Sequence, residues 1–455
     1  MLFWHVPLLL SLGLLSSSAI AAVRSTNSVN TWAGPLNYTE DWAYVNVHSG
    51  AHLFWWLYAA SPASSSRPLF LWLQGGPGSS GVGYGSFEEL GPKDLSGNDR
   101  ASTWLQVGDL VFVDNPVGTG FSYVENSGAY TKTVEDIGKD LLGWAISFFS
   151  AHPEYRDRVF YIVCESYGGK MTAEFARVLN NAVKSGVVPL KKFGGVALGD
   201  SWISPMDYVN TWGPYLYANS YLDEQQLQRV NKQAATCQNL VDNGKWTAAT
   251  DCWDEMEGLV GEETGGVSWY NVLKYGGQDD WSSTLNKEGK RTSIERLFDR
   301  HVRPLQAETL GHYMDTVVRN KLGIIPANVH FGGQSGQVFA YQSGDFMKPN
   351  YATVDELLKQ GLQVTVFNGQ LDLICDTLGT EKWITRLQWP DLKNFLAAPK
   401  KSFETKNFRL AGFTKAYKNL QLIYILRAGH MVAHDTEESG LYVLKQLMTK
   451  SKQFF

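Results

Sequence analysis

The sequence predicts an α/β fold with a mostly parallel β-sheet and helices on both faces. Short apolar runs rich in β-branched and aromatic residues have the length of strands, and amphipathic helical patterns separate the later runs. Strands that are apolar along their whole length are typical of a parallel sheet covered on both faces. The runs are 52–60, 68–74, 109–116, 159–166, 193–200, 363–370 and 421–429, and the helical patterns include 134–152 and 172–186.

The interval between Asp200 and Gln363 interrupts this alternation, because it is mostly polar, helical in pattern and rich in tryptophan. The sheet does not need these residues, so we expect a helical cap insertion over 205–335 that folds across one end of the sheet. The core then consists of 22–204 and 336–455. The stretch "SPASSSRP" (61–68) has the composition of a turn, and we interpret it as the turn of a hairpin.

Residues 1–21 predict a signal peptide. An apolar run from Val6 to Leu15 precedes small residues, with Ala19 and Ala21 in an A-x-A cleavage pattern. An N-terminal anchor helix is the alternative, but the run is shorter than the ~20 residues that a membrane span needs. We therefore expect a secreted or lysosomal protein whose mature chain has no membrane span.

The cysteines and one sequon fit this secretory route. Cys237 and Cys252 lie close together in a polar region and could form a local disulfide. Cys164 and Cys375 lie in apolar strand-like runs, which favours buried free thiols. The N-x-[ST] sequon at Asn37 predicts a glycosylation site.

Composition excludes several classes of partner. The chain is 44% hydrophobic and carries 40 basic and 45 acidic residues, a formal net charge of −5, without a dense Lys/Arg cluster. Nucleic acid is therefore not an expected partner. A Walker phosphate loop, a dinucleotide-binding glycine pattern and a zinc-binding H-E-x-x-H motif are absent from the sequence. We expect neither a metal nor an organic cofactor, and the oligomeric state stays open.

The stretch "VCESYGGK" (163–170) places Ser166 between a predicted strand and a predicted helix. A nucleophile elbow needs this strand–turn–helix context, because the turn lifts the serine hydroxyl above the carboxyl edge of the sheet. Gly168 is the small residue that the elbow requires after the serine, whereas Cys164 replaces the usual glycine before it. Taken alone, the motif does not distinguish a nucleophile from an ordinary turn serine.

An elbow serine predicts an acid and then a histidine, each after a later strand. Asp372 follows the strand-like run 363–370, and His430 follows the run 421–429. Asp376 and His434 are the nearest alternatives, and both lie further from the strand ends. Ser166, Asp372 and His430 are therefore the candidate catalytic triad.

A glycine-rich loop, "QGGPGSSG" (74–81), follows the run 68–74. Glycines allow a backbone to approach a reactive serine closely and to donate N–H groups to a developing oxyanion. A flexible loop is the alternative interpretation.

Several long motifs resemble the serine carboxypeptidase family. They include "LWLQGGPG", "LVFVDNPVGTGFSY", "ESYGGKM", "NGQLDLI" and "AGHMV", and the similarity covers nearly the whole mature chain. The resemblance implies an α/β-hydrolase fold with a helical cap and an enzyme that releases C-terminal amino acids from peptides.

The same resemblance implies roles for individual residues. It assigns the oxyanion N–H groups to Gly76 and Tyr167. It assigns recognition of the substrate's terminal carboxylate to Trp72, Gln74, Gly75 and Glu165, with Glu89 close by, and the leaving-group pocket to Cys375 and Met431. Gln74 and Asp200 stand where many members of the family have Asn.

Two carboxyl groups beside a substrate carboxylate would hold a proton above the ordinary Glu range, so we expect an acidic pH optimum. An acyltransferase or esterase on the same scaffold is one alternative function, since a fold does not determine a reaction. A catalytically weak binding or scavenging protein is another.

Overall fold

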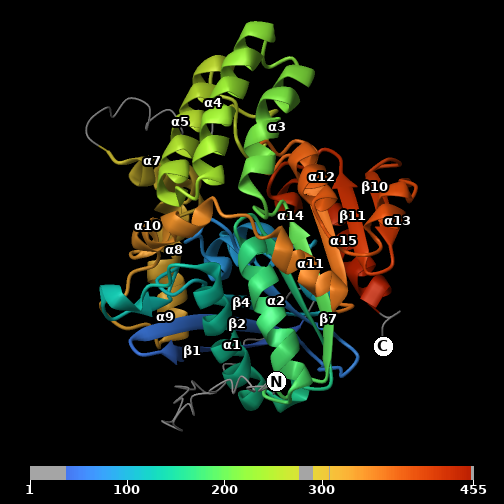
Figure 1. The fold of residues 1–455 in the computed structure, drawn as a ribbon. Helices are drawn as coiled ribbons and strands as arrows, with labels where there is room; N and C mark the ends of the chain where they lie inside the picture. The colour runs from blue at the N-terminus through green and yellow to red at the C-terminus, as the bar shows by residue number, and fades with distance from the viewer. Residues whose placement is uncertain (1–36, 276–290, 307, 452–455) are drawn as a thin grey trace, which may run out of the picture.

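The computed structural model of the chain describes residues 37–275, 291–306 and 308–451. The predicted signal peptide, 1–21, lies outside these residues. In the described ranges, the strands form one eleven-stranded sheet in the order β1-β2-β4-β3-β6-β7-β8-β11-β10-β9, with β5 paired to β2 (Figure 1). Their bounds are β1 Tyr38–His48, β2 Ala51–Ala60, β3 Leu69–Leu73, β4 Asp109–Val113, β5 Tyr123–Val124, β6 Val159–Glu165, β7 Lys192–Gly199, β8 Val364–Gly369, β9 Lys401–Phe403, β10 Gly412–Tyr417 and β11 Leu420–Ile425.

The middle of the sheet, from β4 through β3, β6, β7 and β8 to β11, is parallel, and the outer strands are antiparallel. The strands predicted from the apolar runs are therefore present, and the parallel core is confirmed. Because the carboxyl ends of parallel strands meet at one edge, the loops after β3, β6, β7, β8 and β11 converge there.

The interpretation of 61–68 as a hairpin turn is wrong. β2 pairs with β1 and β4, whereas β3 pairs in parallel with β4 and β6, so β4 lies between the two strands that the stretch connects. The hairpin consists of β1 and β2. β1 was not predicted because it is an edge strand in which buried and more exposed residues are mixed.

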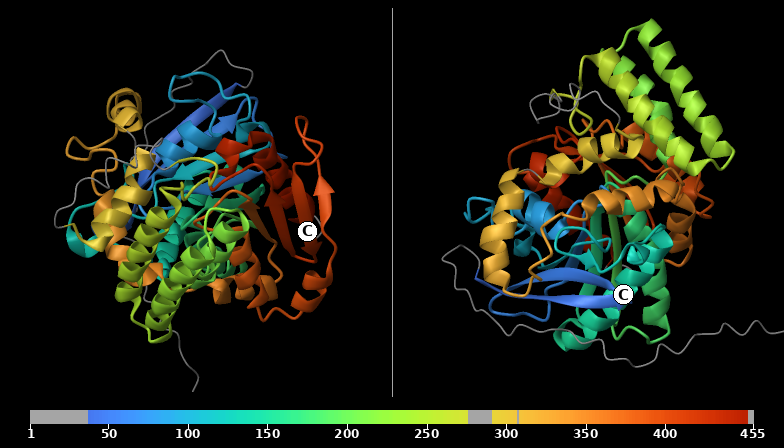
Figure 2. Two further views of the ribbon diagram at one scale, coloured as in Figure 1. Left: turned by 90° about the horizontal axis from the view of Figure 1, so that it is seen from above. Right: turned by 90° about the vertical axis from the view of Figure 1, so that its left-hand side faces the viewer.

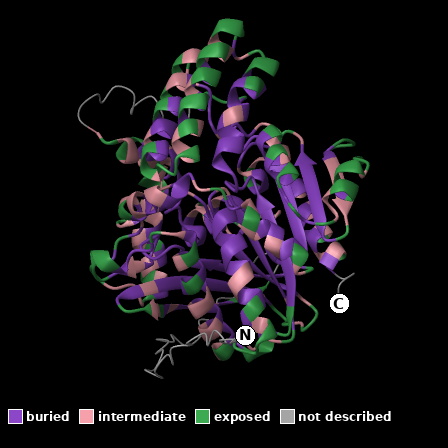
Figure 3. Ribbon diagram, viewed as in Figure 1, coloured by how far each residue is buried: buried purple, intermediate pink, exposed green. Residues whose placement is uncertain are grey.

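Alternate side chains of the central strands enter two hydrophobic clusters. Leu71 and Ile162 pack with α1 and α2 on one face, and Phe70 and Val163 pack with α15 on the other. β3, β4, β8 and β11 are accordingly buried along their whole length, and β6 and β7 are buried except at their first residues (Figure 3). The helices are α1 Val134–Ala151, α2 Gly168–Lys184, α3 Pro205–Ala218, α4 Glu224–Asp242, α5 Trp246–Thr264, α7 Ser293–His301, α8 Glu308–Tyr313, α9 Arg319–Leu322, α10 Ser335–Phe346, α11 Tyr351–Lys359, α12 Thr377–Thr385, α13 Leu392–Ala397, α14 Val432–Asp435 and α15 Glu437–Ser451.

The chain between β7 and β8 is helical, and α4 and α5 project side by side from the rest of the molecule (Figure 2). The side chain of Asp223 caps α4 by accepting from the N–H of Gln226 at 2.8 Å. A disulfide between Cys237 and Cys252 joins α4 to α5, as the sequence suggested, and Cys164 and Cys375 are buried free thiols. None of the helices in the described ranges is both long and apolar enough to cross a lipid bilayer.

Candidate active site

Ser166 occupies the turn between β6 and α2. Its φ is +61°, in the left-handed region that a serine seldom adopts, at a cost of roughly 1–2 kcal/mol. The Ser166 N–H donates to the carbonyls of Gly199 and Asp200, both at 3.1 Å, and the Ser166 carbonyl accepts from the N–H of Trp202 at 2.9 Å. These hydrogen bonds hold the turn, and they leave the serine partly exposed in the wall of a pocket.

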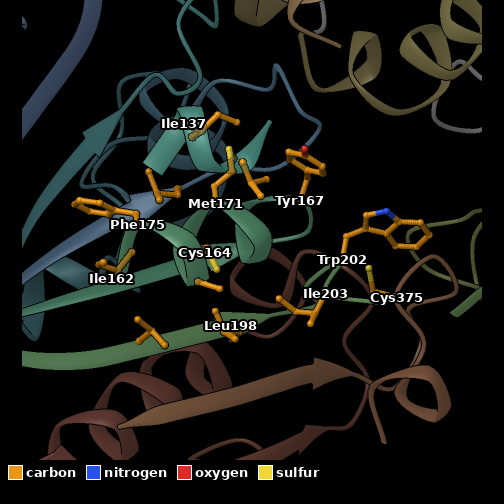
Figure 4. Close-up of a cluster of buried hydrophobic side chains, with 14 of the residues drawn as sticks. Ile137, Ile162, Cys164, Tyr167, Met171, Phe175, Leu198, Trp202, Ile203 and Cys375 are labelled. Carbon is orange, nitrogen blue, oxygen red and sulfur yellow. The ribbon is translucent and has the colours of Figure 1, made fainter. Parts of the chain in front are cut away.

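The residues beneath the turn are apolar. Cys164, which occupies the position of the usual elbow glycine, belongs to one buried cluster with Tyr167 and Met171 (Figure 4). Tyr167 stacks on Phe346 with the ring planes 2° apart, and its hydroxyl donates to Asp345 at 3.3 Å. Packing of Cys164 before Ser166, and of Tyr167 after it, therefore holds the turn that carries the candidate nucleophile.

His430 and Asp372 form a buried pair at the same edge of the sheet. The His430 Nδ1 lies 2.9 Å from the Asp372 Oδ2, and the Cys375 N–H donates to the Asp372 Oδ1 at 3.2 Å. The His430 Nε2 is buried and forms no hydrogen bond with any described residue, although His430 and Ser166 line the same pocket. Contacts between a nucleophile and its base are often long without substrate and shorten when the complex forms.

The glycine-rich loop after β3 approaches Ser166 closely. A Cβ atom added to Gly75 would lie 2.4 Å from the Ser166 Cβ, so only glycine fits there. Gly76 has a φ of +107°, which a residue with a side chain rarely adopts. Gly75, Gly76 and Tyr167 all line the pocket with Ser166, so the predicted oxyanion loop and the elbow face each other.

Glu89 and Glu165 form a buried carboxyl pair next to the serine. The Gln74 Nε2 donates to both, at 2.9 Å to Glu89 and 3.1 Å to Glu165, and the Trp72 Nε1 donates to the Gln74 Oε1 at 2.6 Å. Burial raises the pKa of Glu165 well above its usual range, and the Glu89 charge raises it further. Burial also raises the pKa of Glu89. The pair therefore holds a proton at a pH where an exposed glutamate has lost it.

The structure places the remaining predicted residues as follows. Gln74, Gly75 and Glu165 line the pocket together with Ser166. Trp72 and Glu89 lie behind Gln74 and are buried. Cys375 is fully buried beside Asp372 and His430, and Met431 directly follows His430 and is partly exposed.

The two alternative residues have other contacts. Asp376 caps α12 by accepting from the Gly379 N–H at 2.9 Å, and it accepts from the Thr211 hydroxyl at 2.8 Å. His434 is exposed, and its Nδ1 lies 3.2 Å from the Glu88 carbonyl. These contacts distinguish both residues from Asp372 and His430, which contact each other.

Sequence reasoning missed the wall of the pocket opposite the sheet. Most of its residues lie after β7 or in the helical segment, and Ile374 follows β8 at the end of the NGQLDLI motif; none was assigned to the pocket from the sequence. They are Trp202, Trp253, Tyr270, His301, Leu305, Phe346 and Ile374.

It also missed two backbone anchors in the helical segment. The Trp269 carbonyl accepts from the N–H groups of Leu373 and Ile374, both at 3.1 Å. The Tyr270 carbonyl accepts from the His430 N–H at 2.7 Å. One short stretch of the helical segment thus binds the loops that carry both Asp372 and His430.

One group in the described ranges has the spacing of a metal site. Ligand atoms of Asp372, Cys375 and His430 lie within 4.8 Å of one another. However, Asp372 already contacts the His430 Nδ1, and burial raises the pKa of the Cys375 thiol well above its usual range. A metal needs the thiolate, so the donor set does not suit a metal ion.

A serine on a strand–turn–helix elbow, followed in chain order by a paired aspartate and histidine after later parallel strands, defines an α/β-hydrolase. The crystal structure of a prohormone-processing carboxypeptidase from Saccharomyces cerevisiae has the same fold, with a TM-score of 0.76 at 21% identity over 90% of this chain and 91% of that chain. The sheet order and the helices on both faces agree with this fold.

Sequence comparisons identify the family within the α/β-hydrolases to which the chain belongs. The serine carboxypeptidase family profile matches residues 31–450. Retinoid-inducible serine carboxypeptidase of Mus musculus is 45% identical over 434 residues, which cover 94% of this chain and 95% of the relative. Serine carboxypeptidase-like 51 of Arabidopsis thaliana is 39% identical over 91% of this chain and 93% of its own. The chain therefore belongs to the serine carboxypeptidase family and is a serine-type carboxypeptidase, a hydrolase.

Proposed function

We propose that the protein removes single C-terminal amino acids from peptides through an acyl-enzyme on Ser166, with Asp372 and His430 completing the triad. The observation that carries this proposal is one pocket that contains the strained Ser166, the His430 ring and the carboxyl group of Glu165. The first two groups perform acyl transfer. The third recognises a free C-terminus and makes the enzyme an exopeptidase.

In the proposed mechanism, His430 accepts the Ser166 proton through Nε2 as the hydroxyl attacks the scissile carbonyl. Asp372 holds Nδ1–H and stabilises the imidazolium that forms. The backbone N–H groups of Gly76 and Tyr167 donate to the oxyanion. His430 then returns the proton to the leaving amine, and water releases the acyl group by the same steps in reverse.

Recognition of the C-terminus depends on the protonation state of Glu165. A protonated carboxyl group donates a hydrogen bond to the substrate carboxylate, whereas an ionised one repels it. Trp72 and Gln74 orient the pair Glu89–Glu165, and Gly75 lets the substrate approach. Binding is therefore strong in acid and weakens as pH rises, which produces an acidic optimum. Cys375 and Met431 line the leaving-group pocket in this proposal.

The same proposal assigns the larger organisation of the chain. Residues 205–335 are the cap, because they supply the pocket wall that faces the sheet loops, and 22–204 with 336–455 are the hydrolase core. Residues 1–21 direct the chain into the secretory pathway, to the lysosome or the extracellular space. Asn37 is exposed, as a glycosylated residue must be.

The test compares wild type with Ser166→Ala on N-blocked dipeptides at acid pH, with labelling by an organophosphonate as a second readout. The alanine variant should lose several orders of magnitude in kcat and all labelling while keeping its melting temperature. Retention of more than a few per cent of activity would contradict the assignment. Adding an amine or alcohol acceptor distinguishes hydrolysis from the alternative acyl transfer, because a transferase would form the acceptor adduct in preference to the acid.

A further inference from the structure

Asp200 is a buried carboxyl residue that lies directly after β7 and next to the proposed triad. Its backbone carbonyl accepts from the Ser166 N–H at 3.1 Å, and its own N–H donates to the Phe367 carbonyl at 2.9 Å. The side chain is fully buried, and the φ of Asp200 is +41°. The residue therefore connects the elbow after β6 with the end of β8.

The two oxygens of the Asp200 carboxyl group have different partners. Oδ1 accepts from the Gly369 N–H at 2.7 Å. Oδ2 receives no hydrogen bond from any donor among the described residues, and it is buried. The Asp372 carboxyl group is a neighbour of the Asp200 carboxyl group, and it raises the pKa of Asp200 both through its charge and through a side-chain hydrogen bond. Two carboxylates in such contact cannot both stay ionised, so one of them holds a proton.

The contacts of Asp372 decide which carboxyl group holds that proton. Its Oδ2 faces the His430 Nδ1, and its Oδ1 accepts from the Cys375 N–H, so Asp372 uses both oxygens as acceptors. Asp200 uses only Oδ1 as an acceptor. The Asp200 Oδ2 is therefore the oxygen that is available to carry the shared proton.

The surrounding charges favour the same state. Burial raises the pKa of Asp200 well above its usual range, and Asp372 and Asp435 raise it further. The Asp200 charge also raises the pKa of Glu165, at the end of β6, and of the Cys375 thiol. His430 contacts the Asp372 Oδ2. The groups that face Asp200 are thus three acids, a thiol and one histidine that is already bound to Asp372.

We propose that Asp200 is a positioning residue of the reaction: in its protonated form it donates a hydrogen bond to Asp372, which fixes the carboxylate against the His430 Nδ1. This inference rests on the proposed triad. The position requires one acceptor toward Gly369 and one donor toward Asp372, which a protonated carboxyl group or a carboxamide supplies and a carboxylate does not. Ionised Asp200 would place a second negative charge beside Asp372 and favour imidazolium at His430, which cannot accept the Ser166 proton.

The experiment measures kcat and KM from pH 4 to 8 on one N-blocked dipeptide for wild type, Asp200→Asn and Asp200→Gly. Asn supplies the donor and the acceptor without titrating, and Asn tolerates a positive φ. Gly tolerates the same φ and removes both hydrogen bonds. Thermal unfolding shows whether each variant is folded.

At pH 5, we expect Asp200→Asn to keep kcat within about threefold of wild type, and Asp200→Gly to lose about 10- to 100-fold in kcat with little change in KM. As pH rises toward 8, kcat of wild type should decline relative to kcat of Asp200→Asn, because only wild type can lose the Asp200 proton. The proposal fails if Asp200→Asn loses as much kcat as Asp200→Gly, if Asp200→Gly matches wild type, or if the Asn variant and wild type decline in parallel. If Asp200→Gly does not fold, the Asn profile alone decides.

These outcomes are separate from failure of the proposed function. In that case wild type would show no phosphonate labelling, and Ser166→Ala would match it in activity. A wild type that reacts with phosphonate, combined with Asp200 variants that do not differ as expected, rejects the role of Asp200 alone.

Discussion

Two buried carboxyl pairs lie at the carboxyl edge of the same sheet and differ in what they face. Glu165 of the first pair lines the pocket, and Gln74 bridges it to Glu89. The second pair, Asp200 and Asp372, is buried behind His430 and does not line the pocket. The pKa values of Glu165 and Asp200 are both raised well above their usual ranges, mainly by burial.

The comparison shows how one physical effect serves two purposes. In both pairs, contact between two acids in a low dielectric retains one proton. The proton of the glutamate pair can be donated to a ligand, so it should govern binding. In the proposal, the proton of the aspartate pair lies on Asp200 and is donated in a hydrogen bond to Asp372, so it should govern the chemical step. Changes in the first pair should therefore appear in KM and changes in the second in kcat.

The largest effect should come from breaking the aspartate pair at Asp372. Asp372→Asn removes the charge that stabilises imidazolium and presents an amide that favours the wrong His430 tautomer. We expect kcat to fall by about 10³- to 10⁴-fold, with KM changed much less. Steady-state kinetics at pH 5 tests this, and a loss below tenfold would show that Asp372 is not the triad acid.

A smaller effect should come from the glutamate pair. Because the folded pKa of Glu165 is raised, wild type carries the donating proton in acid and loses it as pH rises through that pKa, so KM rises toward neutrality. Glu165→Gln keeps a donor that does not titrate. Its KM should change little with pH, and we expect it to be about tenfold below wild type near pH 7 and above it at pH 5. KM against pH measures this.

Glu89→Gln is the matched control. It removes the neighbouring charge that raises the pKa of Glu165. KM should therefore begin to rise at a lower pH than in wild type, whereas Glu165→Gln should remove most of the rise. An amidated dipeptide, which lacks the terminal carboxylate, should give a flat profile in every variant. Identical KM profiles for wild type and Glu165→Gln would remove the basis for recognition of the C-terminus.

A further buried acid, Asp376, should affect stability and leave catalysis unchanged. Burial raises the pKa of Asp376 to about 7, from about 3.9 in an unfolded chain. Asp376 therefore contributes stability that is fully present below pH ~4 and is lost as pH rises through about 7. By linkage, the loss is as much as about 4 kcal/mol.

Asp376→Asn should abolish this part of the pH dependence. The amide can accept from the Gly379 N–H and donate to the Thr211 hydroxyl, whose own hydrogen can then turn to the Asp207 carbonyl, 2.8 Å away. Urea unfolding at pH 4.5 and 7.5 should give a smaller difference for the variant than for wild type, with kcat unchanged. Burial also raises the pKa of Asp114 to about 7. Asp114 contributes equally to the pH dependence of stability in wild type and in the variant. An equal difference in the two proteins would refute the role of Asp376.

Local patterns were sufficient to predict the parallel core and the chain order of the candidate triad. The runs that predicted strands are buried on both faces, so their apolar character is continuous and easy to recognise. Ser166, Asp372 and His430 follow three of these strands, and parallel strands bring their carboxyl ends together. The hairpin of β1 and β2 was not predicted, because β1 mixes polar and apolar residues. The short strands β9 and β10 were not predicted either.

The sequence by itself determined the fold class, the family and the candidate triad, because each depends on residues that are neighbours along the chain or on a rule of topology. Only the tertiary structure decided which distant groups meet. Asp200 beside Asp372, and the carbonyl groups of Trp269 and Tyr270 bonded to the loops that carry Asp372 and His430, are contacts between segments far apart in sequence. Such contacts leave no periodic pattern in the sequence. The pKa of a carboxyl group depends on its burial and its charged neighbours, and these exist only after the chain has folded.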